Sequence, residues 1–373
     1  MYPVYDPNVH PEQYDALLAG KAAGMRERFA GFEVPELEVY ASQPTGFRLR
    51  AEFRLWHDGD RCFYAMYAPG DKSQPYEVKG FPIASPLIQR LMQQVLDAVQ
   101  PHELLRRRLF QVEFLTTLSG DALITLIYHK KLEEDWEAAA RELQNQLGFP
   151  IIGRSRKQKI VLEREHVTEQ LTVDGTSYSY RQIEGGFTQP NGEMNQKMLS
   201  WARSCADLIP DGSLNADLVE LYCGNGNFSV AMADKFNRVL ATEISKTSVY
   251  AAQENIRANQ VDNLIIARLS SEEFVQALQG TRKFQRLRDI DISEYDFKTV
   301  LVDPPRAGLD DESVKQIQAY DHIIYISCNP ETLANNLEVL TQTHDIQRFA
   351  LFDQFPYTHH TEAGIFLTRK VSA

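Results

Sequence analysis

The feature that most constrains the fold is a regular alternation of short apolar strands and helices in the second half of the chain. Strands are expected at 218–222, 238–242, 264–267, 299–302, 322–327, 347–352 and 364–368. Helices are expected at 193–206, from 228, at 247–259, at 311–318 and at 331–342. Strands linked by helices in this way form a parallel sheet that is covered on both faces. We therefore predict a Rossmann-like α/β domain over residues 181–373.

Residues 1–180 follow another pattern, in which pairs of strands joined by tight turns are separated by helices. From Phe47 to Leu55, apolar side chains alternate with charged ones, as in a strand with one buried face. Turns at 57–60 and 119–121 join two such strands to their returning partners. The pattern predicts an N-terminal α+β domain built on an antiparallel sheet.

The overall charge of the chain is acidic. It carries 39 Lys and Arg against 51 Asp and Glu, a formal net charge of −12. This balance argues against broad attraction to nucleic acid, because nucleic-acid-binding proteins usually present a basic face. Two basic clusters, residues 106–108 and 154–159, are candidate phosphate contacts. Most charge runs are only solvated surface, so the sequence leaves open whether either cluster binds phosphate.

The cysteine content gives no sign of disulfides or of a metal centre. No C-x-x-C pair occurs among the four cysteines, which are Cys62, Cys205, Cys223 and Cys328. The adjacent histidines His359 and His360 make a poor metal pair. We expect no metal, no iron–sulfur cluster and a reducing, cytoplasmic location. No apolar run reaches about 18 residues, and no basic segment precedes an apolar one at the N-terminus, so neither a membrane span nor a signal peptide is expected.

A glycine-containing turn follows the expected strand at 218–222. Gly224 and Gly226 allow a tight turn before a helix, whose free N–H groups can face a ligand. Glu243 follows the next strand, where a carboxylate can accept hydrogen bonds from ribose hydroxyls. The third glycine of a dinucleotide site is missing, which favours a mononucleoside such as S-adenosylmethionine. The alternative is an ordinary strand–helix turn without a ligand.

Two further motifs follow strands of the same sheet. Asp303-Pro304-Pro305-Arg306 comes directly after the strand at 299–302, and Cys328 comes directly after the strand at 322–327. In an open α/β sheet the ligand crevice lies beyond the carboxyl ends of the strands. Asp303 could instead be a local cap, and a cysteine is commonly a buried core residue. Attack by Cys328 would require a thiolate, whose formation a helix N-terminus or Arg306 could favour.

Four motifs taken together resemble the RNA uracil-5-methyltransferase family. They are Cys-Gly-Asn-Gly-Asn-Phe at 223–228, Asp-Pro-Pro-Arg at 303–306, Ser-Cys-Asn-Pro at 327–330 and Phe-Pro-Tyr-Thr-His-His at 355–360. The resemblance covers nearly the whole chain and is greatest to the bacterial tRNA-directed members. Relatives that act on ribosomal RNA typically carry an extra N-terminal β-barrel and a four-cysteine iron–sulfur cluster, and this sequence has neither.

This resemblance implies methyl transfer from S-adenosylmethionine to carbon 5 of the uridine at position 54 in the tRNA T-loop, with tmRNA or other T-loop-like RNA as further substrates. It implies that Cys328 is the nucleophile and that Glu362 removes the C5 proton. The implied cofactor and base pocket is lined by Gln189, Tyr222, Asn227, Glu243 and Asp303. In the N-terminal domain, which would bind RNA, Phe110 and His129 would stack against the opened T-loop. We expect a monomer.

The chemistry of the reaction fits these residue types. Carbon 5 of uracil is a weak nucleophile until a thiolate adds to carbon 6 and forms an enolate. A base must then remove the C5 proton so that the cysteine can leave. An RNA cytosine-5 methyltransferase is an alternative, but those enzymes typically place a second cysteine beside a proline, and Asp303-Pro304-Pro305 has none. A tRNA-binding or folding factor with secondary methylation activity is another alternative.

Overall fold

The computed structural model of the protein describes residues 9–67, 74–210 and 212–371. The chain divides into two compact units. Unit 1 comprises residues 1–11, 43–170 and 182–192, and unit 2 comprises residues 12–42, 171–181 and 193–373. This division differs from the single boundary expected at 180/181. The reason is that β1 (Leu37–Tyr40) pairs in parallel with β16 (His344–Phe352), so an early segment of the chain belongs to the later sheet.

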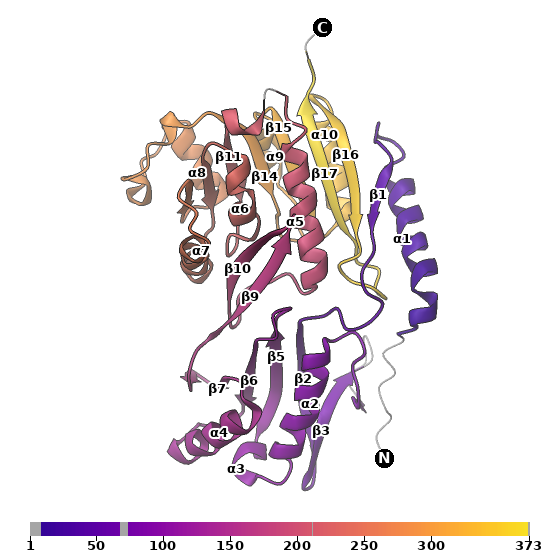
Figure 1. The fold of residues 1–373 in the computed structure, drawn as a ribbon, viewed down its shortest axis with the longest axis vertical. Helices are drawn as coiled ribbons and strands as arrows, with labels where there is room; N and C mark the ends of the chain where they lie inside the picture. The colour runs from indigo at the N-terminus through magenta and orange to yellow at the C-terminus, as the bar shows by residue number, and fades with distance from the viewer. Residues whose placement is uncertain (1–8, 68–73, 211, 372–373) are drawn as a thin grey trace. The chain divides into compact units, whose positions relative to one another are not determined.

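Unit 2 contains an eight-stranded sheet in the order β1-β16-β17-β15-β14-β11-β12-β13 (Figure 1). The other bounds are β11 (Asp217–Leu221), β12 (Val239–Thr242), β13 (Leu264–Ala267), β14 (Phe297–Val302), β15 (His322–Ser327) and β17 (Glu362–Arg369). The predicted α/β class is confirmed, but the sheet is not wholly parallel, because β17 forms a closing hairpin with β16 and is antiparallel to both neighbours. The short connection from β16 to β17 explains the difference, because a parallel pair needs a long crossover.

Helices cover both faces of this sheet (Figure 1). One face packs against α5 (Gly192–Ala206), α6 (Asn227–Met232) and α7 (Lys246–Ala258). The other packs against α1 (Tyr14–Arg28), α8 (Ser271–Leu278), α9 (Asp311–Ile317) and α10 (Pro330–Leu340). Alternate residues of β11 illustrate the two cores, because Leu218 joins the first and Val219 the second. Helix α8 lies in a stretch where only a charged connection was expected, and a Ser270–Glu273 capping box begins it.

Unit 1 contains a seven-stranded sheet in the order β4-β3-β2-β5-β6-β7-β8. Its strands are β2 (Arg50–Asp58), β3 (Arg61–Tyr67), β4 (Pro75–Glu77), β5 (Leu109–Thr116), β6 (Ala122–Tyr128), β7 (Ile151–Ser155) and β8 (Gln158–Val161), and its helices are α2 (Pro86–Val99), α3 (Glu103–Arg106) and α4 (Glu134–Leu147). The sheet is antiparallel as predicted, except that β6 and β7 are parallel because α4 forms a crossover between them. A separate hairpin of β9 (His166–Val173) and β10 (Thr176–Ile183) contributes residues to both units.

The core of unit 1 contains a close approach between helix and sheet. Trp136 of α4 is 1% exposed and packs over Gly153 of β7. A Cβ atom added at Gly153 would lie 2.1 Å from Cη2 of Trp136 and 2.8 Å from Cδ1 of Leu132. Only a glycine therefore lets α4 lie this close to the strand.

We predict that Gly153→Ala lowers the free energy of unfolding by about 1–3 kcal/mol, because the added methyl group overpacks the core. Urea unfolding followed by circular dichroism measures the change. Gly80→Ala in the same unit is the matched control, since nothing lies within 4 Å of its added Cβ. Equal stability of the two variants would contradict the packing argument.

Candidate active site

The candidate site lies at the edge of the unit 2 sheet where the parallel strands end. Strands β11, β12, β14 and β15 are neighbours, so the loops that follow them meet at this edge. Those loops carry most of the sequence-predicted site residues, namely Tyr222, Asn227, Glu243, Asp303 and Cys328. The sheet topology thus brings together groups that are more than 100 positions apart in the chain.

The turn after β11 is held in a defined shape. Tyr222 has φ 63°, a left-handed conformation that is uncommon for a residue other than glycine. Glu243 anchors the turn, because its Oε2 atom accepts a hydrogen bond from the Gly224 N–H at 3.1 Å and its Oε1 atom accepts one from the Ser245 N–H at 2.7 Å. A carboxylate oxygen can accept more than one bond. Glu243 therefore keeps acceptor capacity for a ligand at the sheet edge.

Two other predicted cofactor residues have partners within the unit. The side-chain amides of Asn227 and Asn195 exchange hydrogen bonds of 2.8 and 2.9 Å. The Tyr222 hydroxyl lies 2.9 Å from the Ser271 hydroxyl. These contacts fix the orientation of both side chains at the start of α6 and beside α8.

Cys328 lies between the end of β15 and the N-cap of α10. It is half-buried, whereas the other three cysteines of the chain are buried. Asn329 caps α10 through a bond from the Glu331 N–H, and its Nδ2 atom donates to the Arg306 carbonyl at 3.1 Å. This bond joins the cysteine loop to the Asp-Pro-Pro-Arg loop. Burial, and then the carboxylates of Glu362 and Asp303, raise the pKa of the Cys328 thiol to about 11. Arg306 lowers this pKa, but its effect is smaller than theirs.

Glu362 is the first residue of β17 and is 3% exposed. Ala363 pairs with Ser327 across the antiparallel ladder, so the next residues beyond this pair are Glu362 and Cys328. Burial, together with the neighbouring Asp303 carboxylate, raises the pKa of Glu362 well above its usual range. Burial also raises the pKa of Asp303 to about 7. A thiol and two carboxyl groups therefore share one weakly hydrated region.

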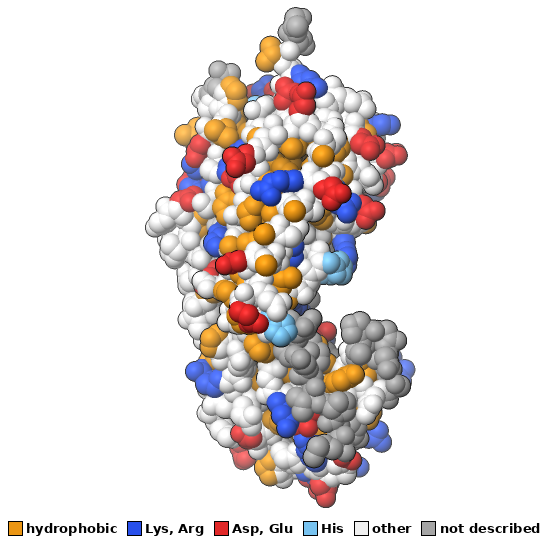
Figure 2. Space-filling model, turned by 90° about the vertical axis from the view of Figure 1, so that its right-hand side faces the viewer, with side chains coloured by type: hydrophobic (Ala, Val, Ile, Leu, Met, Phe, Trp, Pro, Cys, Tyr) orange, Lys and Arg blue, Asp and Glu red, His pale blue; other side chains and the backbone are white. Residues whose placement is uncertain are grey.

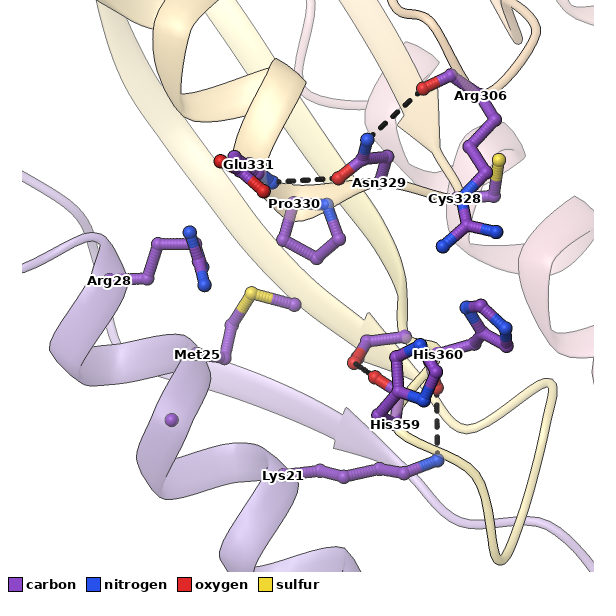
Figure 3. Close-up of a pocket in the computed structure, with 12 residues that line it drawn as sticks. Lys21, Met25, Arg28, Arg306, Cys328, Asn329, Pro330, Glu331, His359 and His360 are labelled. Carbon is purple, nitrogen blue, oxygen red and sulfur yellow. Dashed lines mark hydrogen bonds between the residues drawn. The ribbon is translucent and has the colours of Figure 1, made fainter. Parts of the chain in front are cut away.

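A cavity of about 440 Å³ opens beside Cys328 (Figure 3). Its walls come from α1, from Arg306, from the segment 328–331 and from residues 359–361. Arg28 and Arg306 supply positive charge, against the carboxylate of Glu331, while Lys21 is paired with Asp353. A cavity of this volume suits a nucleotide-sized ligand, and its cationic lining suits a phosphate.

The remaining predicted site residues belong to unit 1. The rings of Phe110 and His129 stack on one another, with centroids 4.0 Å apart, and the Arg54 guanidinium lies over the Phe110 ring at 4.4 Å. Gln189 lies between β10 and α5 in the part of that connection assigned to unit 1. Nearby Phe187 is 72% exposed, an unusual state for a large apolar side chain.

Sequence reasoning missed three residues at this edge of unit 2. Glu220 is 1% exposed inside β11, accepts a hydrogen bond from the Ser229 hydroxyl, and has a pKa raised to about 8, mainly by burial. Its signal was a carboxylate within an apolar strand. Ile244 is 65% exposed directly after Glu243, and only its position after the strand could have indicated it. Lys21 in α1 contacts residues that are over 300 positions away, and no local pattern reveals such contacts.

The described residues contain no group of three or more His, Cys, Asp or Glu side chains that could hold a metal ion. They also include no helix whose length and apolar character would suffice to cross a membrane.

Comparison with solved structures identifies a chain of similar fold. A Pyrococcus abyssi tRNA (uracil-54, C5)-methyltransferase in complex with S-adenosyl-L-homocysteine matches with a TM-score of 0.71 and 19% identity, over 95% of this chain and 83% of that one. At this identity the likeness establishes a shared fold.

Sequence comparison identifies much nearer relatives. A tRNA/tmRNA (uracil-C(5))-methyltransferase of Actinobacillus pleuropneumoniae serotype 3 (strain JL03) is 53% identical over 97% of this chain and 100% of its own length. One of Cellvibrio japonicus (strain Ueda107) is 54% identical over 96% of each chain. A family model described as tRNA (Uracil-5-)-methyltransferase matches residues 13–370. The chain belongs to the tRNA (uracil-5-)-methyltransferase family.

Proposed function

We propose that this protein transfers a methyl group from S-adenosylmethionine to carbon 5 of uridine 54 in the tRNA T-loop, through a covalent bond between Cys328 and carbon 6. tmRNA, which carries a T-loop-like element and is named with tRNA in the descriptions of the relatives, is a second proposed substrate. The observation that carries the proposal is that Cys328, directly after β15, and Glu362, the first residue of antiparallel β17, are adjacent at the sheet edge that also carries the glycine turn. A nucleophile and a base are thus adjacent at the edge where α/β sheets bind ligands.

The residues present fit S-adenosylmethionine, whose sulfonium and ammonium groups are both cationic. Glu220 interacts electrostatically with Asp303 and Glu243, and Glu362 interacts with Asp303, so the sheet edge carries several carboxylates within a short range. The exposed Ile244 side chain beside Glu243 offers an apolar surface for a flat base. Within unit 2, Tyr222, Asn227, Glu243 and Asp303 would hold the cofactor.

Cys328 would begin the reaction. In the free protein its raised pKa keeps it a thiol at neutral pH, so its proton must pass to solvent as the sulfur–carbon 6 bond forms, and this is the proton that the whole reaction releases. The electron pair of the C5–C6 double bond then moves into an enolate, and carbon 5 becomes nucleophilic. When bound, S-adenosylmethionine supplies the electrophilic methyl group that carbon 5 accepts.

Glu362 would complete the reaction. Its carboxylate takes the proton from carbon 5, the C5–C6 double bond re-forms and the bond from carbon 6 to sulfur breaks. The thiolate can then recover a proton from the carboxyl group, which returns both side chains to their starting states. The buried position of Glu362 supports this role, because desolvation makes a carboxylate a stronger base.

The target uracil must flip out of the stacked bases of the RNA, since carbon 6 of a stacked uracil is not accessible to a thiol. Unit 1 is proposed to bind the RNA, with the Phe110–His129 pair stacking against the opened T-loop. We also infer that the enzyme acts as a monomer in the cytoplasm. The four free cysteines are in keeping with a reducing compartment.

The proposed function is tested by incubating the wild-type protein with labelled S-adenosylmethionine and an unmodified tRNA transcript. We expect 5-methyluridine at position 54 after nuclease digestion. Cys328→Ala should form none, yet bind the cofactor in calorimetry, because other loops hold it. RNA with 5-fluorouridine at the target should trap wild-type protein covalently, since fluorine cannot leave as a proton does. Cys62→Ala is the control and should still be trapped; turnover by Cys328→Ala would contradict the covalent mechanism.

Glu362→Gln separates the two halves of the reaction. The amide cannot accept the C5 proton, so we expect a methylated protein–RNA adduct that survives denaturing electrophoresis. Turnover should fall by about 10²–10⁴-fold, the scale for loss of a general base. Glu338→Gln, at an exposed carboxylate of α10, should behave as wild type. Wild-type turnover by Glu362→Gln without an adduct would assign the proton transfer to another group.

A further inference from the structure

A second cavity, of about 900 Å³, lies in unit 1 where β6 ends and β7 turns into β8. Four cationic side chains line it, Lys130, Lys131, Arg156 and Lys157, and no Asp or Glu of the described residues is among its lining. This is unusual in a chain of net charge −12. On the face of unit 2 drawn in Figure 2, by contrast, acidic and basic side chains are interspersed.

The contacts within unit 1 distinguish between the basic residues of the two sequence clusters. Arg154 makes a bidentate pair with Glu184, with both distances 2.6 Å, and Lys159 contacts Glu165 at 2.5 Å and Glu184 at 3.1 Å. These two cations are therefore neutralised by carboxylates. In the cluster 106–108, Arg106 is bound to the carbonyls of Asp60 and Gln100.

Arg156 and Lys157 differ from these neighbours. Both are exposed at the tip of the β7–β8 turn, and neither has a carboxylate partner in the described part of the chain. Lys157 has φ 61°, a conformation that usually favours glycine or asparagine. The turn thus presents two uncompensated positive charges. One of them is on Lys157, whose left-handed backbone conformation is unfavourable for a lysine.

The cavity also adjoins an aromatic surface, because His129 both lines it and stacks on Phe110. Proteins that bind single-stranded nucleic acid combine such stacking surfaces with a groove of positive charge that follows the phosphates. If a base of an RNA strand stacks against His129, the phosphates next to that base would lie near the cavity.

From this juxtaposition we propose that the cavity is a binding site for the RNA phosphate backbone, with Arg156 and Lys157 as its main contacts. The inference rests on the proposed function and assigns part of its substrate recognition to the β7–β8 turn. Binding there releases counterions from the RNA, so its contribution depends on salt.

The test measures binding of an unmodified tRNA transcript across a salt series. The variant Arg156→Ala/Lys157→Gly should raise Kd roughly tenfold at moderate salt and reduce the slope of log K against log salt by about 1.4–1.8. Glycine suits the backbone at position 157, so the thermal midpoint should not fall. Lys79→Gln/Arg61→Gln, which removes two cations of unit 1 outside the cavity, should have less effect on the slope.

An unchanged Kd and slope in a folded Arg156→Ala/Lys157→Gly protein would overturn the site, whatever the activity. An equal change in the control variant would also overturn it, since the effect would then reflect net charge alone. Failure of the wild-type protein to methylate the same transcript would instead refute the proposed function.

A separate observation concerns Lys21 of α1. Its ammonium group donates to Oδ1 of Asp353 at 2.6 Å, to the Phe355 carbonyl at 2.8 Å and to the His360 carbonyl at 3.0 Å. An ammonium has three protons, so every donor is used within the connection between β16 and β17. Lys21 and Asp353 are only 11% and 1% exposed. Figure 3 shows Lys21 reaching from α1 to the segment that carries His359 and His360.

We infer that Lys21 is a positioning residue for the proposed base, because the segment that it fixes leads directly into Glu362. The Cys328 loop is held by other contacts, through Asn329 and Arg306. Loss of the Lys21 contacts should therefore affect elimination more than addition.

The test uses Lys21→Met/Asp353→Asn, which removes the ion pair without leaving a buried charge. We expect kcat to fall roughly 10–100-fold and KM for tRNA to stay within about twofold, while the 5-fluorouridine adduct still forms at the wild-type rate. Arg238→Met/Asp217→Asn, which removes a matched pair at the start of β11 and β12, should leave kcat unchanged. Unchanged kcat in the Lys21 variant, or equal loss of adduct formation and turnover, would overturn the role.

Discussion

Strand β17 is the element on which the arrangement of the site depends. It lies between β15 and β16 and runs against both, so the loop before it returns to the edge where the parallel strands end. Its register with β15 is fixed by the pairing of Ser327 with Ala363, and a shift of one residue would turn every side chain to the opposite face. The adjacency of Cys328 and Glu362 along the chain backbone therefore follows from the hydrogen-bonded pairing of the two strands.

The site also concentrates negative charge where water is scarce. Glu220, Asp303 and Glu362 all have raised pKa values, and burial is the largest cause for each. Buried carboxyl groups that repel one another reduce stability unless a ligand or a proton compensates them. A cationic cofactor would relieve this repulsion. The carboxylates that destabilise the free protein would therefore favour binding of the cofactor. Burial and the same carboxylates also raise the pKa of the Cys328 thiol, which favours its protonated form in the free protein.

Much of the fold, and the positions of most candidate site residues at one sheet edge, could be predicted from the sequence, since both depend on local patterns. Short apolar runs between helices correctly indicated β11, β14 and β15. Glu243, Asp303 and Cys328 were then identified because each follows the end of an expected strand. The pairing of β1 with β16 was not predicted, because strand order is a property of distant segments. For the same reason the sequence could not show which basic residues of the clusters 106–108 and 154–159 are free to contact phosphate. Arg154 and Arg156 are alike in sequence, and only tertiary contact with Glu184 shows that one is neutralised.

The pairing of β1 with β16 has a consequence for synthesis of the chain on the ribosome. Residues 12–42 emerge early, yet their apolar side chains, such as Phe29 and Leu37, pack in a core completed by strands near the C-terminus. Most of unit 1 is made in between and has its own core, so it can fold while the nascent chain is still growing. The reactive edge, by contrast, cannot form before the last strands have left the ribosome. A prematurely terminated chain would thus retain a folded unit 1 but lack the edge that carries the candidate site.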